Sequence, residues 1–336
     1  MTDAQAAAFA PLSGRRLGMI DIGARDGILP HWEPVARWLD VLAFEADPEE
    51  AERLKTTLAR GGAQVDVRPH AVWETRGTQT LHVTRHPALS SLYEPRRALV
   101  AQFPHTARFD VIERVAVETV TLDECLNNAS FTPHFVKIDA QGGTLPVLRG
   151  GARALQSTLG LELEVELVPL YEGEPLFGEV DAFLRAKGFE LIDLRPTYWR
   201  RETAQRVAGT LGQLIFGDVL YMVSPAEFAR RLQAVSPDRA AHLLRCARLC
   251  CAVYGLQDWA MVYNGVAAEL GLAATPRLPN AAGVRVARWP EFPLRHALGL
   301  ALKDFGDLLL QSGDNWANAE QRLGSKLRSR HVQRFL

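Results

Sequence analysis

The sequence predicts an α/β protein with a mostly parallel, helix-covered sheet, followed by a helical C-terminal region. From residue 17 to residue 223, short apolar runs alternate with amphipathic stretches, which is typical of a sheet covered by helices. After residue 223 the pattern becomes helical only. We therefore divide the 336 residues into an N-terminal extension (1–16), an α/β domain (17–223) and a helical C-terminal domain (224–336).

The first strands are short, continuous apolar runs, "LGMIDIG" and "VLAFEAD", as expected for strands buried on both faces. Asp47, Pro48 and Glu50 supply a helix start directly after the second run. "QVDVRPHAVW" is predicted as the third strand. "TQTLHVT" and "FDVIERVAVETV" are predicted as further strands, with an antiparallel elaboration of the sheet as one possibility.

Four later strands complete the predicted sheet: "HFVKIDAQGG", "LELEVELV", "FELIDL" and "QLIFGDVLYMV". The last two are candidates for an antiparallel edge pair. Beyond them, Ser224-Pro225 and Ser236-Pro237 each predict the start of a helix. Stretches near 258–271, 293–311 and 314–330 also have a helical pattern.

Composition excludes several classes of protein. The 38 basic and 39 acidic side chains leave a net charge of −1, which argues against a nucleic-acid partner. No apolar run reaches the roughly 18 residues that would span a bilayer. The N-terminal segment lacks the basic region of a secretory signal, so we expect a cytoplasmic protein. Four cysteines predict buried thiols rather than disulfides or a metal site, with Cys246, Cys250 and Cys251 in one helical pattern.

The loop after the first strand indicates the kind of ligand. It contains Asp21, Gly23 and Gly27, which supply a tight turn but not the glycine spacing of a dinucleotide fingerprint. A carboxylate at Asp21 would repel the pyrophosphate of NAD and would attract the sulfonium and ammonium of S-adenosylmethionine. Asp139 ends the "VKID" strand, and we expect it beside Asp21 at the point where strand order reverses.

Glu45 supplies a candidate for the nucleoside end of the same ligand. It ends the second strand and lies 18 residues after Gly27, close to the interval of about 20 at which an acidic residue binds ribose hydroxyls. The alternative is that Glu45, like Asp47, only caps the following helix. For Gly23 and Gly27 the alternative is an ordinary strand-to-helix turn.

Five segments together resemble the FkbM-type S-adenosylmethionine-dependent methyltransferases: "MIDIGARDG", "FEADP", "VTLDECL", "FVKIDAQGGTLPVLRGG" and "LEVELVPLYEGEPLF". The resemblance covers residues 17–223 and implies a Rossmann-like class I methyltransferase sheet, with seven strands and the last antiparallel. It also implies that S-adenosylmethionine is bound by Asp21, Gly23, Gly27, Glu45, Asp139, Gln141 and Gly142. Arg25 and Thr144 depart from the family pattern.

Methyl transfer depends mainly on positioning, and a base need only remove a hydroxyl proton. The candidates for this role are Asp139, Glu164, Glu166 and His86. Glu162, Glu164 and Glu166 alternate with apolar residues and share one face of a strand, so the alternative is a solvated groove or pairing with arginines. His70 and His134 are interpreted as packing residues.

Tyr93 and Tyr171 are candidate contacts for the acceptor, because each lies in a loop and offers a ring face for stacking; core packing is the alternative for both. The resemblance implies an O-methyltransferase acting on a hydroxyl of a sugar, a glycan or a secondary metabolite. A second hypothesis is a non-catalytic scaffold whose helical C-terminal domain docks partners in glycan assembly. An NAD-dependent dehydrogenase is disfavoured by Asp21 and by the missing glycine spacing.

Overall fold

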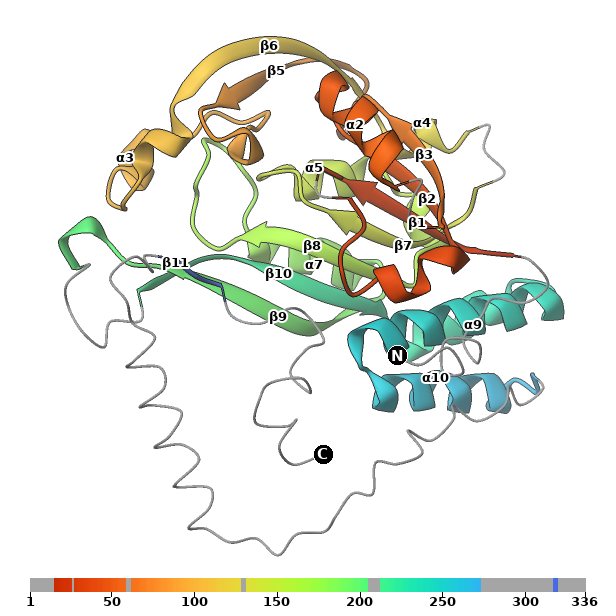
Figure 1. Cartoon of the computed structure of the whole chain (residues 1–336). Helices are drawn as coiled ribbons and strands as arrows, with labels where there is room; N and C mark the ends of the chain where they lie inside the picture. The colour runs from red at the N-terminus through yellow and green to blue at the C-terminus, as the bar shows by residue number, and fades with distance from the viewer. Residues whose placement is uncertain are drawn as a thin grey trace, which may run out of the picture.

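The computed structural model describes residues 15–25, 27–58, 62–127, 131–204, 212–272 and 317–319. Its main sheet has the strand order β11-β9-β10-β8-β7-β1-β2-β3 (Figure 1). Five neighbouring strands are parallel: β1 (Leu17–Ile22), β2 (Leu39–Phe44), β3 (Gln64–Arg68), β7 (Pro133–Ile138) and β8 (Gly160–Glu166). The antiparallel pair predicted at the edge is confirmed: β10 (Gln213–Val223) runs antiparallel to β8 and to β9 (Phe189–Trp199).

The run predicted as the third strand is divided between two sheets. Its first part is β3, whereas β4 (Ala71–Val72) pairs with β6 (Val111–Val120), which pairs with β5 (Gly77–Thr84) in a separate three-stranded sheet. Pro69 lies between β3 and β4 and has no backbone N–H to give to a ladder, which accounts for the break. The predicted elaboration is therefore confirmed as a second sheet, seen as the arch of β5 and β6 in Figure 1.

The helices of the α/β part begin where their capping residues predict. At the start of α4 (Leu122–Cys125), the Thr121 hydroxyl accepts a hydrogen bond from the backbone N–H of Glu124, and the Glu124 carboxylate accepts one from the backbone N–H of Thr121. Asp47 accepts from the N–H groups of Glu49 and Glu50 at the start of α2 (Pro48–Leu58). Further helices are η2 (Glu33–Trp38), η4 (Pro87–Leu89), α3 (Arg97–Val100), η5 (Thr106–Phe109), α5 (Thr144–Arg149), α6 (Ala154–Ser157), α7 (Phe177–Ala186) and η6 (Glu202–Ala204).

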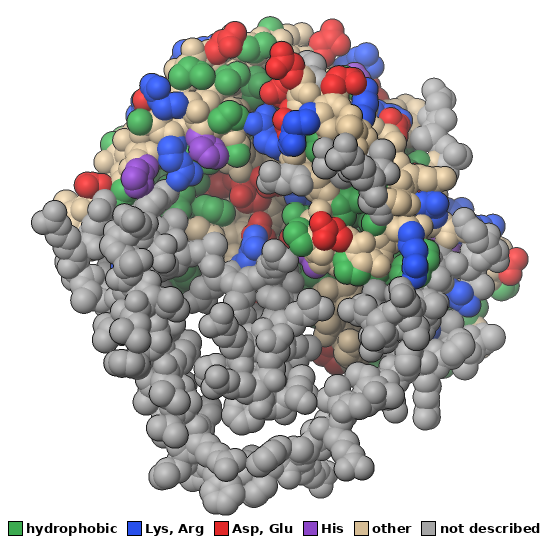
Figure 2. All heavy atoms as spheres, in the orientation of Figure 1, with side chains coloured by type: hydrophobic (Ala, Val, Ile, Leu, Met, Phe, Trp, Pro, Cys, Tyr) green, Lys and Arg blue, Asp and Glu red, His purple; other side chains and the backbone are tan. Residues whose placement is uncertain are grey.

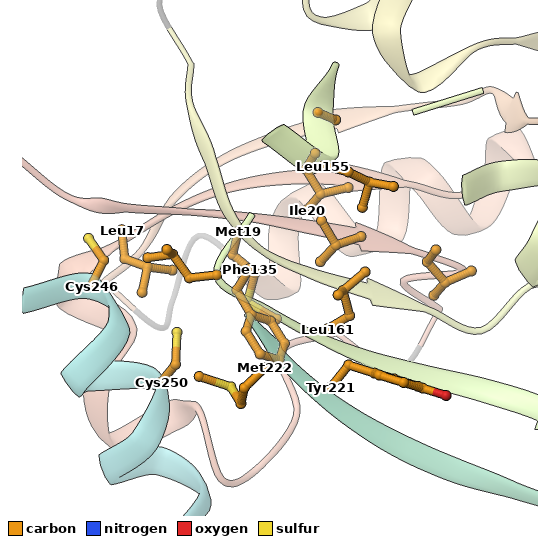
Figure 3. Close-up of a cluster of buried hydrophobic side chains, with 14 of the residues drawn as sticks. Leu17, Met19, Ile20, Phe135, Leu155, Leu161, Tyr221, Met222, Cys246 and Cys250 are labelled. Carbon is orange, nitrogen blue, oxygen red and sulfur yellow. The ribbon is translucent and has the colours of Figure 1, made fainter. Parts of the chain in front are cut away.

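Three helices follow the sheet: α8 (Pro225–Gln233), α9 (Pro237–Tyr254) and α10 (Gln257–Glu269). Two of them start at the prolines that predict them. Side chains of α9 enter the same apolar cluster as the sheet, and Figure 3 shows Cys246 and Cys250 beside Leu17 and Phe135. The prediction of buried thiols is confirmed for α9, because Cys246, Cys250 and Cys251 are all 0% exposed.

The C-terminal prediction is only partly covered by the described residues. The helix predicted near 293–311 lies outside them. Within the stretch 314–330, residues Ala317–Ala319 form β11, which pairs antiparallel with the edge of β9, so the helical prediction is wrong there. An edge strand has unpaired backbone N–H and C=O groups, and these can pair with a short segment even when its sequence has a helical pattern. Among the described helices, none has the length and apolar character needed to cross a membrane.

Candidate active site

The site lies at the carboxyl ends of β1 and β7, where the strand order reverses. The backbone N–H of Asp139 donates to the carbonyl of Ile22 at 2.9 Å, so the loops after the two strands are in contact, as predicted. Gly23 has a φ of +74°, and a Cβ atom there would lie 2.0 Å from the Asp139 carbonyl oxygen. Glycine is therefore required at this position by both conformation and space.

Lys137 links the two aspartates, and it was not predicted. Its Nζ lies 3.2 Å from Asp21 Oδ1 and 3.9 Å from Asp139 Oδ2, and it donates to the Gly23 carbonyl at 3.0 Å. Burial alone would lower the pKa of Lys137, but the charges of Asp21 and Asp139 outweigh burial and raise it. Asp21 is thus a buried, paired carboxylate, whereas the side chain of Asp139 is 41% exposed.

The three glutamates on one face of β8 have three different environments. Glu162, 7% exposed, accepts from the hydroxyl of Tyr254 on α9 and is 3.1 Å from His31 Nε2. Trp32 Nε1 donates to the same hydroxyl at 3.1 Å. Burial opposes ionisation of Glu162, but the hydrogen bond from His31, its charge and the Tyr254 hydroxyl outweigh burial and lower its pKa. His31 is a second residue that the sequence reasoning missed.

Glu164 faces Gln141, whose Nε2 donates to Glu164 Oε1 at 2.5 Å and to Asp139 Oδ1 at 3.1 Å. Asp218 of β10 lies opposite Glu164 in the pairing of β8 with β10, and it accepts a hydrogen bond from Arg195 Nε at 2.7 Å. Burial raises the pKa of Glu164 well above its usual range, and the nearby charge of Asp139 adds to the effect. Both effects favour the protonated form of Glu164.

Gln141 is the centre of the hydrogen-bond network. Its φ of 45° is in the left-handed region, which is uncommon for a residue with a side chain. The Tyr171 hydroxyl donates to Gln141 Oε1 at 2.9 Å, and the Ser91 hydroxyl donates to the Gln141 carbonyl at 2.6 Å. The Ser91 bond joins the loop after β7 to the Ser90–Pro95 loop, and the bonds to Tyr171 and Glu164 join it to β8 and the loop that follows β8.

Glu166 and Glu174 border the adjacent Gly142. The backbone N–H of Gly142 donates to Glu166 Oε1 at 2.9 Å, and a Cβ at Gly142 would lie 2.5 Å from Glu174 Oε2. Burial raises the pKa of Glu166 well above its usual range and that of Glu174 to about 8. Burial thus disfavours the charged form of both side chains. Figure 2 shows carboxylate side chains at the bottom of a hollow in this face of the molecule.

The remaining predicted cofactor residues lie along the same edge of the sheet. Glu45, 8% exposed, accepts from the Asp47 N–H at 3.0 Å and lies 3.8 Å from Arg25 Nε. Arg25 also reaches Asp47 at 3.4 Å, which explains this departure from the family pattern as a pairing with acids. Gly27 has a φ of +75° and its N–H donates to Ala24, so it closes the turn after β1. Ribose binding by Glu45 stays a prediction.

The structure gives the predicted acceptor residues different roles. Tyr171 is fully buried and its hydroxyl positions Gln141. Tyr93 is partly buried, with its ring 5.4 Å from that of Trp73. His86 is exposed just before η4, and its N–H donates to the Arg108 carbonyl. Contact of Tyr93 or Tyr171 with an acceptor, and catalysis by His86, stay predictions.

Thr144 and His134 are both structural. Thr144 stands at the other departure from the family pattern, and its hydroxyl donates to the Glu164 carbonyl at 2.7 Å, which fastens the start of α5 to β8. His134 is 4% exposed and its Nδ1 accepts from the Gly18 N–H at 2.9 Å. Packing was the interpretation of His134, and it is confirmed.

The order β3-β2-β1-β7-β8-β10-β9, with β10 antiparallel, defines the sheet of a class I methyltransferase. The model of the "Methyltransferase FkbM domain" matches residues 21–191, which is half of the chain. The protein therefore belongs to the FkbM methyltransferase family, whose cofactor is S-adenosylmethionine. The resemblance found in the sequence is confirmed.

Comparison with solved structures finds distant similarity to methyltransferases. One is precorrin-6y C5,15-methyltransferase from Geobacter metallireducens, at 11% identity over 66% of this chain and 86% of that one, with a TM-score of 0.34. Another is magnesium protoporphyrin IX methyltransferase from Synechocystis, with bound cofactor, at 9% identity over 62% and 71%, with a TM-score of 0.32. No curated protein matches the chain.

The residues at this edge fit S-adenosylmethionine. The cofactor carries positive charge on sulfur and nitrogen and has no phosphate, and the described residues around Gly23 and Gly142 are carboxylates and amides. Lys137, the cation among them, is already paired with Asp21 and Asp139, so Asp139 is the carboxylate that remains accessible. A dinucleotide pyrophosphate would meet these acids unfavourably.

Proposed function

We propose that the chain transfers the methyl group of S-adenosylmethionine to a hydroxyl oxygen of a sugar, a glycan or a secondary metabolite. The observation that supports this most directly is that the amide of Gln141 links one accessible carboxylate, Asp139, to Glu164, a buried neighbour whose pKa is raised well above its usual range. The net charge of −1 favours such an acceptor over nucleic acid, and cytoplasmic action is part of the same proposal.

The cofactor supplies an electrophilic methyl group, and the chain's own residues have two tasks. The first is to hold the acceptor oxygen in line with the carbon–sulfur bond that breaks, which accounts for most of the rate. The second is to take the hydroxyl proton as the new carbon–oxygen bond forms. Asp139 is suited to that task because its side chain is the accessible carboxylate of the group.

Glu164 and Glu166 are suited to a different task. Burial raises the pKa of both well above its usual range, and both accept hydrogen bonds from the loop after β7, so they position that loop. Glu166 is only 3% exposed and its Oε1 accepts from the Gly142 N–H, so it orients the loop. Glu164 is the acid closer to Asp139, since the two share Gln141 Nε2.

The first test measures cofactor binding by calorimetry in the full chain. Asp21→Ala should abolish detectable binding of S-adenosylmethionine, and Asp139→Asn should weaken it while still allowing saturation at high cofactor concentration. The matched control is Asp66→Asn, which removes an exposed carboxylate paired with Arg68 on β3 and should bind normally. Wild-type affinity in both Asp21→Ala and Asp139→Asn would rule out this cleft as the cofactor site.

The second test uses labelled cofactor and a panel of glycans and hydroxylated metabolites, with the product identified as a methyl ether by NMR. If Asp139 is the base, residual activity of Asp139→Asn at saturating cofactor should be about 10²–10⁴-fold lower. Glu164→Gln should stay within about threefold of wild type, since glutamine mimics a protonated acid in shape and hydrogen bonding. Bound cofactor without transfer to any hydroxyl would favour the non-catalytic scaffold instead.

A further inference from the structure

A cavity of about 420 Å³ opens at the amino ends of β1 and β7, on the opposite edge of the sheet from the candidate active site. Gly18 near the start of β1, His134 of β7 and Leu243 of α9 contribute to its wall. Its volume falls within the range of about 300–1,000 Å³ that is typical of small-molecule sites. A ligand there would not touch Asp139 or Gln141, which follow the other end of β7.

The charged residues around this cavity are mostly basic. Its described lining includes Arg15, Arg16 and Arg239 against one carboxylate, Asp40. The rings of His134 and His242 also line it but add no charge at neutral pH, because burial lowers the pKa of His134 to about 3 and lowers that of His242. Asp40 lies close enough to Arg16 for that charge to lower its pKa, although burial raises it more. Arg239 is in the first turn of α9, an 18-residue helix whose N-terminus adds positive potential on the same side. The electrostatic character of the cavity favours an anion.

His242 provides an unsatisfied donor or acceptor at the wall. Its residue is 6% exposed, and its Nδ1 has no hydrogen-bond partner among the described residues. Its Nε2 lies 3.6 Å from the Cys246 sulfur, so the ring is oriented by α9 itself. A buried polar atom without a partner costs about 1–3 kcal/mol.

The same neighbourhood does not fit a metal ion, although His134, His242 and Cys246 bring ligand atoms within 4.8 Å of one another. His134 Nδ1 accepts from the Gly18 N–H, so the ring proton is on Nε2 and the lone pair of the neutral ring is already used. Arg15 and Arg239 would also repel a cation. The lining therefore selects an anion over a metal.

We propose that this cavity binds a small organic phosphate, with the guanidinium groups of Arg15 and Arg239 contacting the phosphoryl oxygens. Guanidinium groups match the geometry of phosphate oxygens and bind them in pairs. The volume exceeds that needed for an inorganic ion, so the remainder of the ligand occupies the space towards Gly18 and Leu243. This site is independent of the proposed methyl transfer.

The test is calorimetric titration of the full chain with inorganic phosphate, pyrophosphate and glycerol 3-phosphate, with ionic strength held constant by sodium chloride. We expect saturable binding that is tightest for an organic phosphate. Arg239→Ala should weaken it at least tenfold and Arg239→Glu should abolish it. The matched control is Arg230→Ala, an exposed arginine of α8 paired with Glu227, which should bind like the wild type.

Three outcomes would overturn the proposal: no saturable binding of any phosphate probe, unchanged binding in Arg239→Glu, or equal weakening in Arg230→Ala.

An experiment with lipid vesicles distinguishes a phosphate of a lipid headgroup from a phosphate of a free metabolite. Flotation with phosphatidic acid vesicles that requires Arg239, and does not occur with phosphatidylcholine vesicles, would assign the phosphate to a lipid headgroup; titration with glycerol 3-phosphate alone would assign it to a free metabolite. Affinity for S-adenosylmethionine should be unchanged in all Arg239 variants, which separates this test from that of the proposed function.

Discussion

The two ends of the same pair of strands, β1 and β7, present opposite charges. At the carboxyl end, Asp21 and Asp139 are joined by Lys137, which comes from within β7 itself. At the amino end, Gly18 and His134 meet arginines supplied from outside the sheet. The comparison teaches that the carboxyl end is held by buried pairs within the fold, whereas the amino end presents the guanidinium groups of Arg15 and Arg239 to a cavity.

The largest effect should follow from removing the cation at the carboxyl end. Lys137→Met leaves Asp21 buried without its partner, and we expect a loss of about 3–5 kcal/mol in unfolding free energy, measured by urea denaturation. Lys187→Met removes an exposed lysine and should cost less than about 0.5 kcal/mol. Adding Asp21→Asn to Lys137→Met should recover part of the loss. A loss below about 1 kcal/mol in Lys137→Met would show that the pair does not stabilise this end.

A smaller effect is expected where α9 reaches the sheet. Tyr254→Phe removes the hydroxyl that donates to Glu162 and accepts from Trp32, so urea denaturation should show a loss of about 1–3 kcal/mol. Tyr263→Phe, which loses a bond to the neutral carbonyl of Val223, should cost less. Equal losses in the two variants would mean that the charge of Glu162 contributes nothing beyond an ordinary hydrogen bond.

The protonated acids of the carboxyl end predict a fall in stability as pH rises. The pKa of Glu174 is about 8 in the folded chain against an ordinary 4.5, so the native state holds a proton that the unfolded state releases between these values. Unfolding free energy should therefore decrease from pH 6 to pH 8 by up to about 1.4 kcal/mol per unit from this group. Glu174→Gln should flatten the slope, whereas Glu172→Gln, at an exposed neighbour, should not. Identical slopes in wild type and Glu174→Gln would contradict the buried-acid assignment.

The smallest effect on stability is expected at the amino end. Arg239 is exposed in the first turn of α9, so Arg239→Ala should change the unfolding free energy by less than about 0.5 kcal/mol without added phosphate. Thermal unfolding with and without glycerol 3-phosphate then distinguishes a contribution of Arg239 to the stability of the fold from its contribution to phosphate binding. A loss above about 1.5 kcal/mol in the absence of ligand would mean that Arg239 supports the fold rather than the cavity.

Local signals made most of the sheet predictable. The apolar runs, the caps at Asp47 and Thr121, and the loop glycines each act within a few residues, and the structure confirms the strands and helix starts that they predict. Lys137 and His31 were missed because their partners lie 114 and 131 positions away in the chain. The one available signal for Lys137 was a lone lysine inside the apolar run "HFVKID".

Contacts between residues far apart in the chain also set the environments of the three glutamates on β8, which the alternation of polar and apolar residues could not predict. The pattern placed Glu162, Glu164 and Glu166 on one face, but their partners come from α9 and from the loops after β1 and β7. Arginine pairing, one of the alternatives for these glutamates, is not what the described contacts show. The helical prediction over Ala317–Ala319 failed for a related reason, because a sheet edge decided the conformation there.

The reach of Tyr254 into the sheet has a practical consequence for anyone who trims this chain. A recombinant fragment that ends at Val223 would lack the Tyr254 hydroxyl that donates to Glu162. It would also expose the apolar side chains of the sheet that Cys246 and Cys250 cover. Such a fragment should aggregate on expression, even though it retains the whole segment that matches the family. Shortened versions for crystallisation or assay should therefore retain α8 to α10.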